Sequence, residues 1–526
     1  MHETRTPDPD TFAALWETTV AAHGARVFLT FRDATHPDAT WTYAAFDRAV
    51  RTFADRLRAH GVGRGDTVHL CLANSPVFVA AWLATSRLGA CMVPVDPSSG
   101  RTELGTQIAR TSAALTVTTT DRATELGADL PDHPVLVVTG DAADLGPGGV
   151  ADASPATAAE APAEIGPDDR IAIMFTSGTT SQPKGVVLTQ ANYAYTARTM
   201  AELAGLRPEH RWLVVLPLFH GNAQFYCFAS AIAVGASVAL THAFSASGWA
   251  AQARELAATH ASLFAAPIRM ILARTPEGTA PLSLTHVWFA QNLSQGHHAR
   301  FGALCGVHPR QLYGMTETTA VATAQSPERA GPDTIGPAVP GRRIDLVDPA
   351  TGEPTAEGPG VIVVHGVRGR DLFLEYMDAP EINARVFGRA EDGTGEEGAG
   401  HDTFSTGDLA RRDAAGVFTF VGRVDDVVKV SGENVSLTEV EAALAEAPGV
   451  LEVAVVAEPD PVRDVVPHAF VVPQDPAEPP SVATLEAFAA ARLPKASRPR
   501  HWTTVGSLPR TSVGKIRRFQ LQKPTT

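Results

Sequence analysis

Residues 171–185 read Ile-Ala-Ile-Met-Phe-Thr-Ser-Gly-Thr-Thr-Ser-Gln-Pro-Lys-Gly. The first five are apolar, and a short apolar run bounded by a turn signal predicts a buried strand over 171–175. The residues that follow combine glycines, hydroxyl side chains and a lysine, groups that can converge on phosphate oxygens. The order differs from a Walker A loop, because Pro183 precedes Lys184 and Gly185 follows it. The stretch therefore predicts a strand that leads into a phosphate-binding turn.

Outward from this stretch, strand-like and helix-like patterns alternate. Before it, we expect strands at 67–72 and 91–95 and helices at 46–60 and 77–88. From 171–175 onward a second series adds strands at 211–216, 238–241 and 263–265 and helices at 192–203 and 249–259. Such alternation is typical of parallel sheets covered by helices.

The composition and the predicted secondary structure change at two places along the chain. Residues 141–167 are rich in Ala, Pro, Gly and acidic side chains and predict a long loop or linker. Short β runs separated by turn residues predict a small β-rich unit at about 341–420. We expect an α/β fold with a large N-terminal domain over 1–421, composed of two parallel-sheet αβ subdomains plus the β-rich subdomain. A small α+β C-terminal domain would occupy 422–526.

Composition excludes several classes of protein. The chain has 526 residues, 44% of them hydrophobic, and a formal net charge of −14. An acidic chain of this kind is a poor non-specific ligand for nucleic acid or anionic membranes, so neither is expected as a partner. The longest apolar run, 225–240, is shorter than the ~20 residues of a membrane span and predicts a buried helix, a turn and a strand.

The cysteines and the N-terminus favour the cytoplasm. Four widely spaced cysteines form no C-x-x-C pair, which predicts buried core residues rather than a zinc or redox site. Residues 1–10 are polar, so no signal peptide is expected.

Five further segments carry reactive side chains in a fixed order. They are Leu216-Pro-Leu-Phe-His-Gly-Asn222, Tyr313-Gly-Met-Thr-Glu-Thr318, Ser405-Thr-Gly-Asp-Leu409, Gly422-Arg-Val-Asp-Asp426 continuing to Lys429-Val-Ser-Gly-Glu-Asn434, and Pro509-Arg-Thr-Ser-Val-Gly-Lys-Ile-Arg517. With the 171–185 stretch, this set resembles the acyl-adenylate-forming (AMP-binding) superfamily from about Trp41 to Arg518. The segments around His220, Asn292 and 366–376 are most similar to the acyl-CoA synthetase branch, in particular carnitine/crotonobetaine-type CoA ligases.

The resemblance implies a reaction in two steps. A carboxylic acid attacks the α-phosphate of ATP, with Mg²⁺ as cofactor, to give an acyl-adenylate and pyrophosphate. A thiol, CoA or the phosphopantetheine arm of a carrier protein, then displaces AMP. Amide formation, a nitrite-activating diazotase and a binding or half-reaction relative that makes no adenylate remain alternatives. The family also leaves a homodimer open.

The resemblance also assigns roles to residues. The residues that it implies for ATP binding are Thr176, Ser177, Gly178, Thr179, Thr180, Lys184, Asn292, Tyr313, Gly314, Met315, Thr316, Asp408, Arg423 and Lys515. Within this set Tyr313 would pack on adenine, and Asp408 would accept hydrogen bonds from both ribose hydroxyls. Glu317 would ligate Mg²⁺, while Lys515, Lys184, His220 and Thr316 would act in catalysis. Lys515 would bridge the two anionic reactants.

The remaining assignments concern the acid, the hinge and the thiol. The acid pocket would be lined by His220, Gly221, Asn222, Ala265, Ala290, Gln291 and Asn292. No carboxylate stands at its entrance for an α-amine, so an α-amino acid is not expected as substrate. The C-terminal domain would be a mobile lid that turns about Asp425, and Lys429, Ser431 and Gly432 would line the thiol tunnel.

Overall fold

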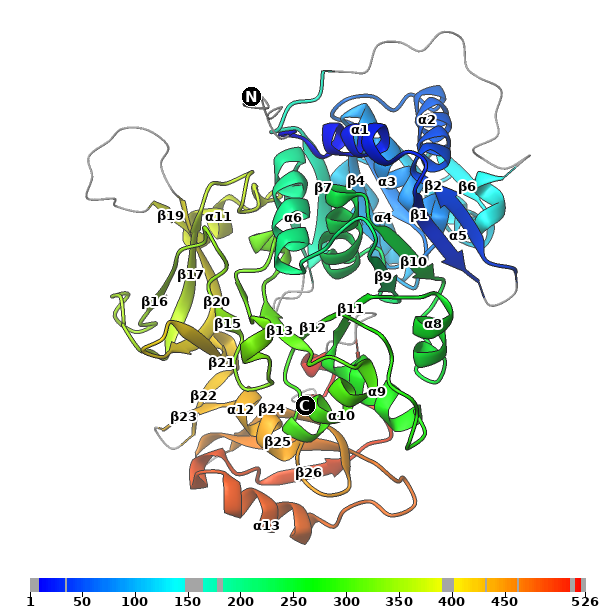
Figure 1. Cartoon of the computed structure of the whole chain (residues 1–526). Coiled ribbons are helices and arrows are strands. Elements are labelled where there is room, and N and C mark those ends of the chain that lie inside the picture. The colour runs from blue at the N-terminus through cyan, green and yellow to red at the C-terminus, as the bar shows by residue number, and fades with distance from the viewer. Residues whose placement is uncertain are drawn as a thin grey trace, which may run out of the picture.

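The computed structural model describes residues 9–33, 36–146, 164–176, 183–389, 402–430, 433–460, 463–510 and 516–521. Figure 1 shows a large α/β body, a β-rich unit at its side and a C-terminal unit below it. The predicted α/β class, with two parallel-sheet units, a β-rich unit and a C-terminal α+β unit, is confirmed.

The first sheet has seven strands in the order β18-β8-β7-β4-β3-β5-β6. Their bounds are β3 (Thr67–Cys71), β4 (Cys91–Val95), β5 (Leu115–Thr119), β6 (Val135–Val138), β7 (Arg170–Thr176), β8 (Lys184–Thr189) and β18 (Glu375–Tyr376). The strands from β7 to β6 run parallel, whereas β8 returns antiparallel to β7 and pairs Lys184 with Thr176. The two ends of the predicted phosphate turn therefore lie side by side.

The second sheet has eight strands in the order β14-β13-β12-β11-β9-β10-β1-β2. Their bounds are β1 (Val27–Arg32), β2 (Ala39–Thr42), β9 (Arg211–Val214), β10 (Ser237–Thr241), β11 (His260–Phe264), β12 (His286–Ala290), β13 (Arg310–Tyr313) and β14 (Thr323–Ala324). One expectation was wrong here. We grouped the strand at 171–175 with 211–216, but β7 lies beside β4 in the first sheet, with Ala172 opposite Met92. The apolar pattern specifies a strand, whereas its neighbour is decided by long-range packing.

Helices fill the space between the sheets and cover their outer faces (Figure 1). Their bounds are α1 (Phe12–His23), α2 (Tyr43–Ala59), α3 (Pro76–Leu88), α4 (Arg101–Thr111), α5 (Thr120–Asp129), α6 (Gln190–Leu203), α7 (Ser230–Val234), α8 (Trp249–Glu255), α9 (Ala265–Arg274) and α10 (Gln295–Cys305). A single apolar cluster joins both sheets, with Phe12 stacked on Trp82 at 5.4 Å between ring centroids. The predicted buried helix, turn and strand at 225–240 are present, and Gly235 makes the turn at φ 73°.

The β-rich unit is an antiparallel sheet with strand order β15-β21-β20-β17-β16, and β19 pairs with β20. The bounds are β15 (Gly336–Pro337), β16 (Ile344–Val347), β17 (Gly360–Gly366), β19 (Phe387–Arg389), β20 (Asp402–Arg412) and β21 (Val417–Arg423), with α11 (Pro380–Val386) alongside. In this sheet Asp408 on β20 stands opposite Arg423 on β21.

The C-terminal unit contains one five-stranded sheet and two helices. Their bounds are β22 (Val427–Val430), β23 (Glu433–Ser436), β24 (Val450–Asp460), β25 (Asp464–Pro473), β26 (His501–Thr504), α12 (Leu437–Leu444) and α13 (Val482–Arg492). The sheet separates two apolar clusters of its own, one under the helices and one around Phe470 and Leu508. The short 3₁₀ turn Val424–Asp426 connects this unit to β21.

Two expectations from composition also bear on the fold. The four cysteines are buried and unpaired, as predicted, and burial raises the pKa of Cys71 to about 11 and of Cys91 to about 12. Across the described residues, none of the helices combines the length and the apolar character that a membrane span requires.

Candidate functional site at the boundary of the α/β body and the β-rich unit

Tyr313 and Asp408 meet at the boundary between the second sheet and the β-rich unit. The Tyr313 hydroxyl donates to Asp408 Oδ2 at 2.7 Å, although 95 residues separate the two in sequence. Arg423 Nε lies 3.5 Å from Asp408 Oδ1, so a guanidinium flanks the same carboxylate. Asp408 is only 6% exposed. Burial and the nearby Asp408 charge raise the pKa of Tyr313, which keeps its hydroxyl a donor.

The second group of side chains surrounds the end of the predicted phosphate turn. Lys184 Nζ lies 5.1 Å from the ring centroid of Tyr376, and the Tyr376 hydroxyl donates to Glu317 Oε1 at 2.8 Å. Arg110 on α4 donates from Nη1 to the carbonyl of Pro183 at 2.9 Å and so holds the end of the turn. Lys184, Thr176 and Glu317 are thus brought to one place. Ser177, Gly178, Thr179 and Thr180 lie outside the described residues.

Tyr376 is a site residue that the sequence analysis missed. It lies on the two-residue strand β18, which pairs with β8 next to Lys184. Burial and the Glu317 charge raise its pKa, so the hydroxyl remains a hydrogen-bond donor to the carboxylate. The available signal was the similarity of 366–376 to the CoA ligases, which indicated relatedness but not a partner for Glu317.

The loop after β13 connects the two groups. Gly314 is required there, because a Cβ at this position would lie 2.9 Å from Val321 Cα. The Met315 amide donates to Thr318 Oγ1 at 3.0 Å, and Thr316–Thr318 forms a 3₁₀ turn. The Glu317 carbonyl accepts a hydrogen bond from the amide of Phe373 at 2.9 Å. The backbone thus fixes Tyr313, Thr316 and Glu317 relative to one another.

Arg342 stabilises this loop and is a second residue that could not be identified from the sequence. Its side chain is fully buried, donates from Nη2 to the Thr318 carbonyl at 3.0 Å and pairs with Asp371 at 3.2 Å. Nothing in the local sequence distinguished it from the other arginines of the chain.

Mg²⁺ fits the donor set at Glu317. A carboxylate is a hard oxygen ligand, and Mg²⁺ is usually held by one or two carboxylates together with substrate phosphates. The Glu317 side chain is inside the site, and Tyr376 uses Oε1 only. Within the described part of the chain, no cluster of three or more His, Cys, Asp or Glu side chains is arranged to bind a metal without such phosphates.

The residues predicted for the acid pocket lie in different parts of the second sheet and its surroundings. His220, Gly221 and Asn222 lie at the start of the π-helix Asn222–Ala229, and Asn222 Nδ2 donates to Ser262 Oγ on β11 at 3.0 Å. Ala290 packs against the apolar cluster between the sheets, whereas Ala265 belongs to a separate cluster with Leu263 and Phe289. The structure therefore does not place Ala265 in the same cluster as Ala290.

Gln291 and Asn292, also predicted for the acid pocket, each have a backbone carbonyl that accepts a side-chain hydrogen bond. Gln291 has φ 75°, unusual for a residue with a side chain, and its carbonyl accepts from Gln311 Nε2 at 3.2 Å. The Asn292 carbonyl accepts from Arg269 Nη1 at 3.4 Å.

The C-terminal residues lie on the neighbouring unit. Asp425 is in the connecting 3₁₀ turn, and Lys429 is exposed on β22. Ser431, Gly432 and Lys515 lie outside the described residues, but Arg510 and Ile516, on either side of the Lys515 segment, form an isolated antiparallel β-bridge.

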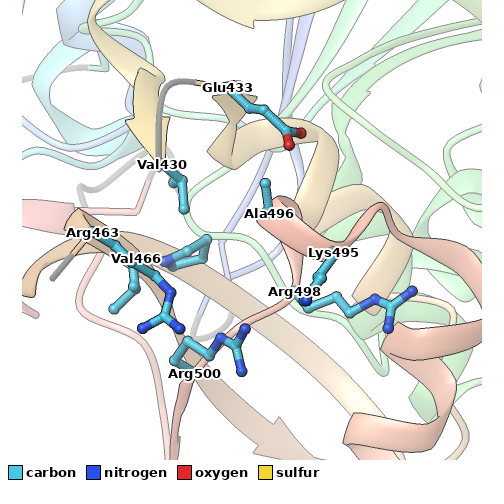
Figure 2. Close-up of a pocket in the computed structure, with 9 residues that line it drawn as sticks. Val430, Glu433, Arg463, Val466, Lys495, Ala496, Arg498 and Arg500 are labelled. Atoms are coloured by element: carbon cyan, nitrogen blue, oxygen red, sulfur yellow. The ribbon is translucent and has the colours of Figure 1, made fainter.

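A basic cavity opens beside β22, where Val430 lines it. Its volume is about 300 Å³, and its lining residues are Val430, Glu433, Arg463, Val466, Pro467, Lys495, Ala496, Arg498 and Arg500. Figure 2 shows the side chains of Arg463 and Arg500 close together at one end. Arg498 Nε donates to the Leu493 carbonyl at 2.9 Å, which anchors that side chain. The sequence did not reveal this cavity, because its cations come from two separate segments, Arg463 and 495–500.

Comparison with known proteins shows which families and proteins this chain is similar to. Residues 16–377 match the AMP-binding enzyme family, and residues 439–515 match the AMP-binding enzyme C-terminal domain. A crotonobetaine/carnitine–CoA ligase of Citrobacter koseri is 30% identical over 519 residues, covering 95% of this chain and 97% of that protein. The protein of that name from Escherichia coli O1:K1 is 29% identical over 97% of this chain and 98% of its own length.

Solved structures share the fold over nearly the whole chain. ATP-bound MatB from Rhodopseudomonas palustris has a TM-score of 0.83 at 25% identity and covers 97% of this chain and 98% of its own. A benzoate CoA ligase from Burkholderia xenovorans LB400 has a TM-score of 0.83 at 23% identity, over 98% of this chain and 100% of its own.

Proposed function

This chain belongs to the AMP-binding enzyme family, and on that premise we propose that it is an AMP-forming acid–thiol ligase that makes an acyl-CoA. The observation that carries the proposal is the meeting of Tyr313, Asp408 and Arg423 next to Lys184, Tyr376 and Glu317. One group suits a nucleoside and the other a polyphosphate, and a single loop connects them.

In the first step the substrate carboxylate attacks the α-phosphorus of ATP, and the bond to the β-phosphate breaks. Such a reaction requires positioning and charge neutralisation rather than covalent work by the protein. Asp408 would accept the ribose hydroxyls, Lys184 would stabilise the departing pyrophosphate and Thr316 would contact the α-phosphate. Mg²⁺ held at Glu317 would neutralise triphosphate charge. Lys515 would lie between the two anions and reduce their repulsion.

In the second step a thiolate attacks the acyl carbonyl and AMP leaves. The basic cavity favours CoA over a carrier protein as the thiol substrate. CoA carries a 3′-phosphate and a diphosphate, whereas a carrier protein's phosphopantetheine arm brings no adenosine phosphates to such a site. Four cations, Arg463, Lys495, Arg498 and Arg500, face one carboxylate, Glu433, around the cavity. Arginines bind phosphate through parallel hydrogen bonds.

The acid is not expected to be an α-amino acid, because no carboxylate stands near His220 to pair with an α-amine. The curated relatives are named for crotonobetaine and carnitine, so these acids belong in any first test. His220 and Asn222 would stand at the entrance and wall of the pocket, where they would select among acids.

A two-stage assay tests the proposal. A panel of acids is screened for acid-dependent ATP–pyrophosphate exchange, and active acids are then tested for CoA consumption. We expect exchange with at least one acid and a stoichiometric acyl-CoA product. Exchange without CoA consumption would contradict the assigned acceptor, and absence of exchange with every acid would contradict the adenylation.

The cavity is tested with paired thiols. Removing a phosphate contact costs about 1.5–3 kcal/mol, or about 10- to 100-fold. Arg498→Gln and Arg500→Gln should therefore raise KM for CoA about tenfold or more and leave KM for pantetheine unchanged. Equal changes for both thiols would contradict a phosphate role.

A further inference from the structure

Arg518 lies three residues after Lys515 in the sequence, and its guanidinium sits between two carboxylates. Its Nε and Nη2 donate to the two oxygens of Glu441 at 3.1 and 2.7 Å. Its Nη1 donates to Asp426 Oδ2 at 3.4 Å. A guanidinium that bonds both oxygens of a carboxylate fixes orientation as well as distance. The chain beyond Lys515 is therefore held to α12 and to the connecting turn.

The partners of Arg518 are buried enough for these bonds to matter. The side chain of Glu441 is 13% exposed and that of Asp426 is 15% exposed. Glu441 Oε1 also accepts from the amide of Val455 on β24 at 2.8 Å. Burial raises the pKa of Glu441, and the charge of Arg518 opposes that rise. Removing Arg518 would leave a buried carboxylate without its cation, which is costly.

The residue preceding the Lys515 segment is held in a similar way. Arg510 Nη2 donates to Glu452 Oε1 on β24 at 2.6 Å. Arg510 pairs with Ile516, and the Arg517 amide donates to the Pro509 carbonyl at 2.8 Å. Residues 511–515 lie outside the described residues. The chain before them is attached to β24, and the chain after them is attached to α12 and to the connecting turn.

The second attachment of Arg518 reaches the hinge. Asp426 is the last residue of the 3₁₀ turn Val424–Asp426, which includes the predicted hinge residue Asp425. Arg518 thus connects the Lys515 side of the C-terminal unit with the point about which this unit would turn.

We propose that Arg518 is a positioning residue for acid activation, because it fixes the described chain directly after Lys515, residues 516–521, relative to the hinge. A fixed anchor at this place would limit where the ammonium of Lys515 can lie between acid and ATP when the C-terminal unit closes. The inference rests on the proposed function, because it matters only if Lys515 acts in acid activation. Thioester formation would use the other face of the unit, around Lys429, and would not depend on this placement.

The test compares two half-reactions in Arg518→Ala, Arg518→Lys and Asp426→Asn. Acid-dependent ATP–pyrophosphate exchange reports adenylation, and CoA added to a supplied acyl-adenylate reports thioester formation. A misplacement of about 1 Å costs about 100-fold, so Arg518→Ala should lower the kcat of exchange by about that factor. Thioester formation should stay within about threefold of wild type on the same reasoning.

Arg518→Lys and Asp426→Asn are milder variants, and they separate the bond of Arg518 to Glu441 from its bond to Asp426. Arg518→Lys keeps the charge but cannot bond both oxygens of Glu441, so we expect partial rescue of exchange. Asp426→Asn leaves the Glu441 pair intact and removes only the charge at the hinge. It should lower exchange by about tenfold, again without loss of thioester formation. It also keeps the test valid if Arg518→Ala fails to fold.

Arg492→Ala is the matched control, because Arg492 forms an ion pair with Glu446 in the same unit. Both side chains of that pair are well exposed, and such pairs contribute little. Exchange and thioester formation should both be unchanged in this variant. Equal losses of both half-reactions in Arg518→Ala and Asp426→Asn, or no loss of exchange, would overturn the inference alone. Absence of exchange in the wild-type protein would overturn the proposed function and this inference with it.

Discussion

The proposed nucleotide site in the large domain and the charged groups of the C-terminal unit are built in different ways. In the large domain, Tyr313 with Asp408 and Tyr376 with Glu317 are buried pairs whose members lie 95 and 59 residues apart. In the C-terminal unit, the cations line a surface cavity or flank the Lys515 segment. The first arrangement is pre-organised for one ligand. The second belongs to a unit with its own core, which under the proposed function would approach and withdraw as a lid.

Lys515→Ala should produce the largest difference between the two regions. Removing one charged group that stabilises a transition state costs about 100- to 1000-fold. We expect ATP–pyrophosphate exchange to fall by at least that factor, while thioester formation from a supplied acyl-adenylate is kept. Equal loss of the two half-reactions would contradict a role for Lys515 confined to adenylation.

Tyr313→Phe and Asp408→Asn should weaken ATP binding at the proposed nucleotide site of the large domain. A hydrogen bond to a buried charged group contributes about 1.5–3 kcal/mol. Asp408→Asn, which removes the charged acceptor for ribose, should raise KM for ATP by about 10- to 100-fold. Tyr313→Phe, which leaves the carboxylate in place, should have a smaller effect in the same direction. Unchanged ATP affinity in Asp408→Asn, measured by equilibrium binding, would remove Asp408 from the nucleotide site.

Tyr376→Phe should weaken Mg²⁺ binding more than it weakens binding of the nucleoside part of ATP. Loss of the hydroxyl frees Glu317 from its 2.8 Å hydrogen bond and lets the carboxylate turn. We expect about a tenfold higher Mg²⁺ requirement for exchange, from the loss of about 1–1.5 kcal/mol. A titration of exchange against Mg²⁺ at saturating ATP measures it. A shift in KM for the acid instead would place Tyr376 in the acid pocket.

Acid should destabilise the large domain through its buried histidines. Burial lowers the pKa of His260 to about 3 and of His69 to about 4, from about 6.5 when unfolded. Between these values the unfolded chain binds more protons, so stability is complete above about pH 6.5 and falls as the pH drops. Each histidine should contribute a slope of about 1.4 kcal/mol per pH unit.

Urea unfolding at about pH 7 and about pH 5 measures this slope. A neutral replacement, His260→Asn, should make the slope shallower. An unaltered slope in His260→Asn would show that this imidazole is already charged in the folded protein.

The local sequence predicted individual strands and helices of this fold better than it predicted which strands pair with one another. The apolar runs at 67–72 and 91–95 and the glycine-closed helix at 77–88 predicted β3, β4 and α3, because burial and capping are local signals. The placement of β7 was wrong, since pairing with β4 depends on contacts far away in sequence.

The candidate site shows the same limit. Asp408 and Glu317 could be named from motifs, but Tyr376 could not be named as a partner of Glu317. Its strand, β18, has only two residues, too short for a period to be read. The cations of the basic cavity come from separate segments, around Arg463 and Lys495, that only folding brings together.

The most direct test of the account is acid-dependent ATP–pyrophosphate exchange in the wild-type protein beside Asp408→Ala, with thermal unfolding of both. We predict exchange with at least one carboxylic acid in the wild type, a loss of about 100-fold or more in Asp408→Ala and similar unfolding temperatures. Wild-type exchange that survives the loss of Asp408 would contradict a single nucleotide site formed by the α/β body and the β-rich unit.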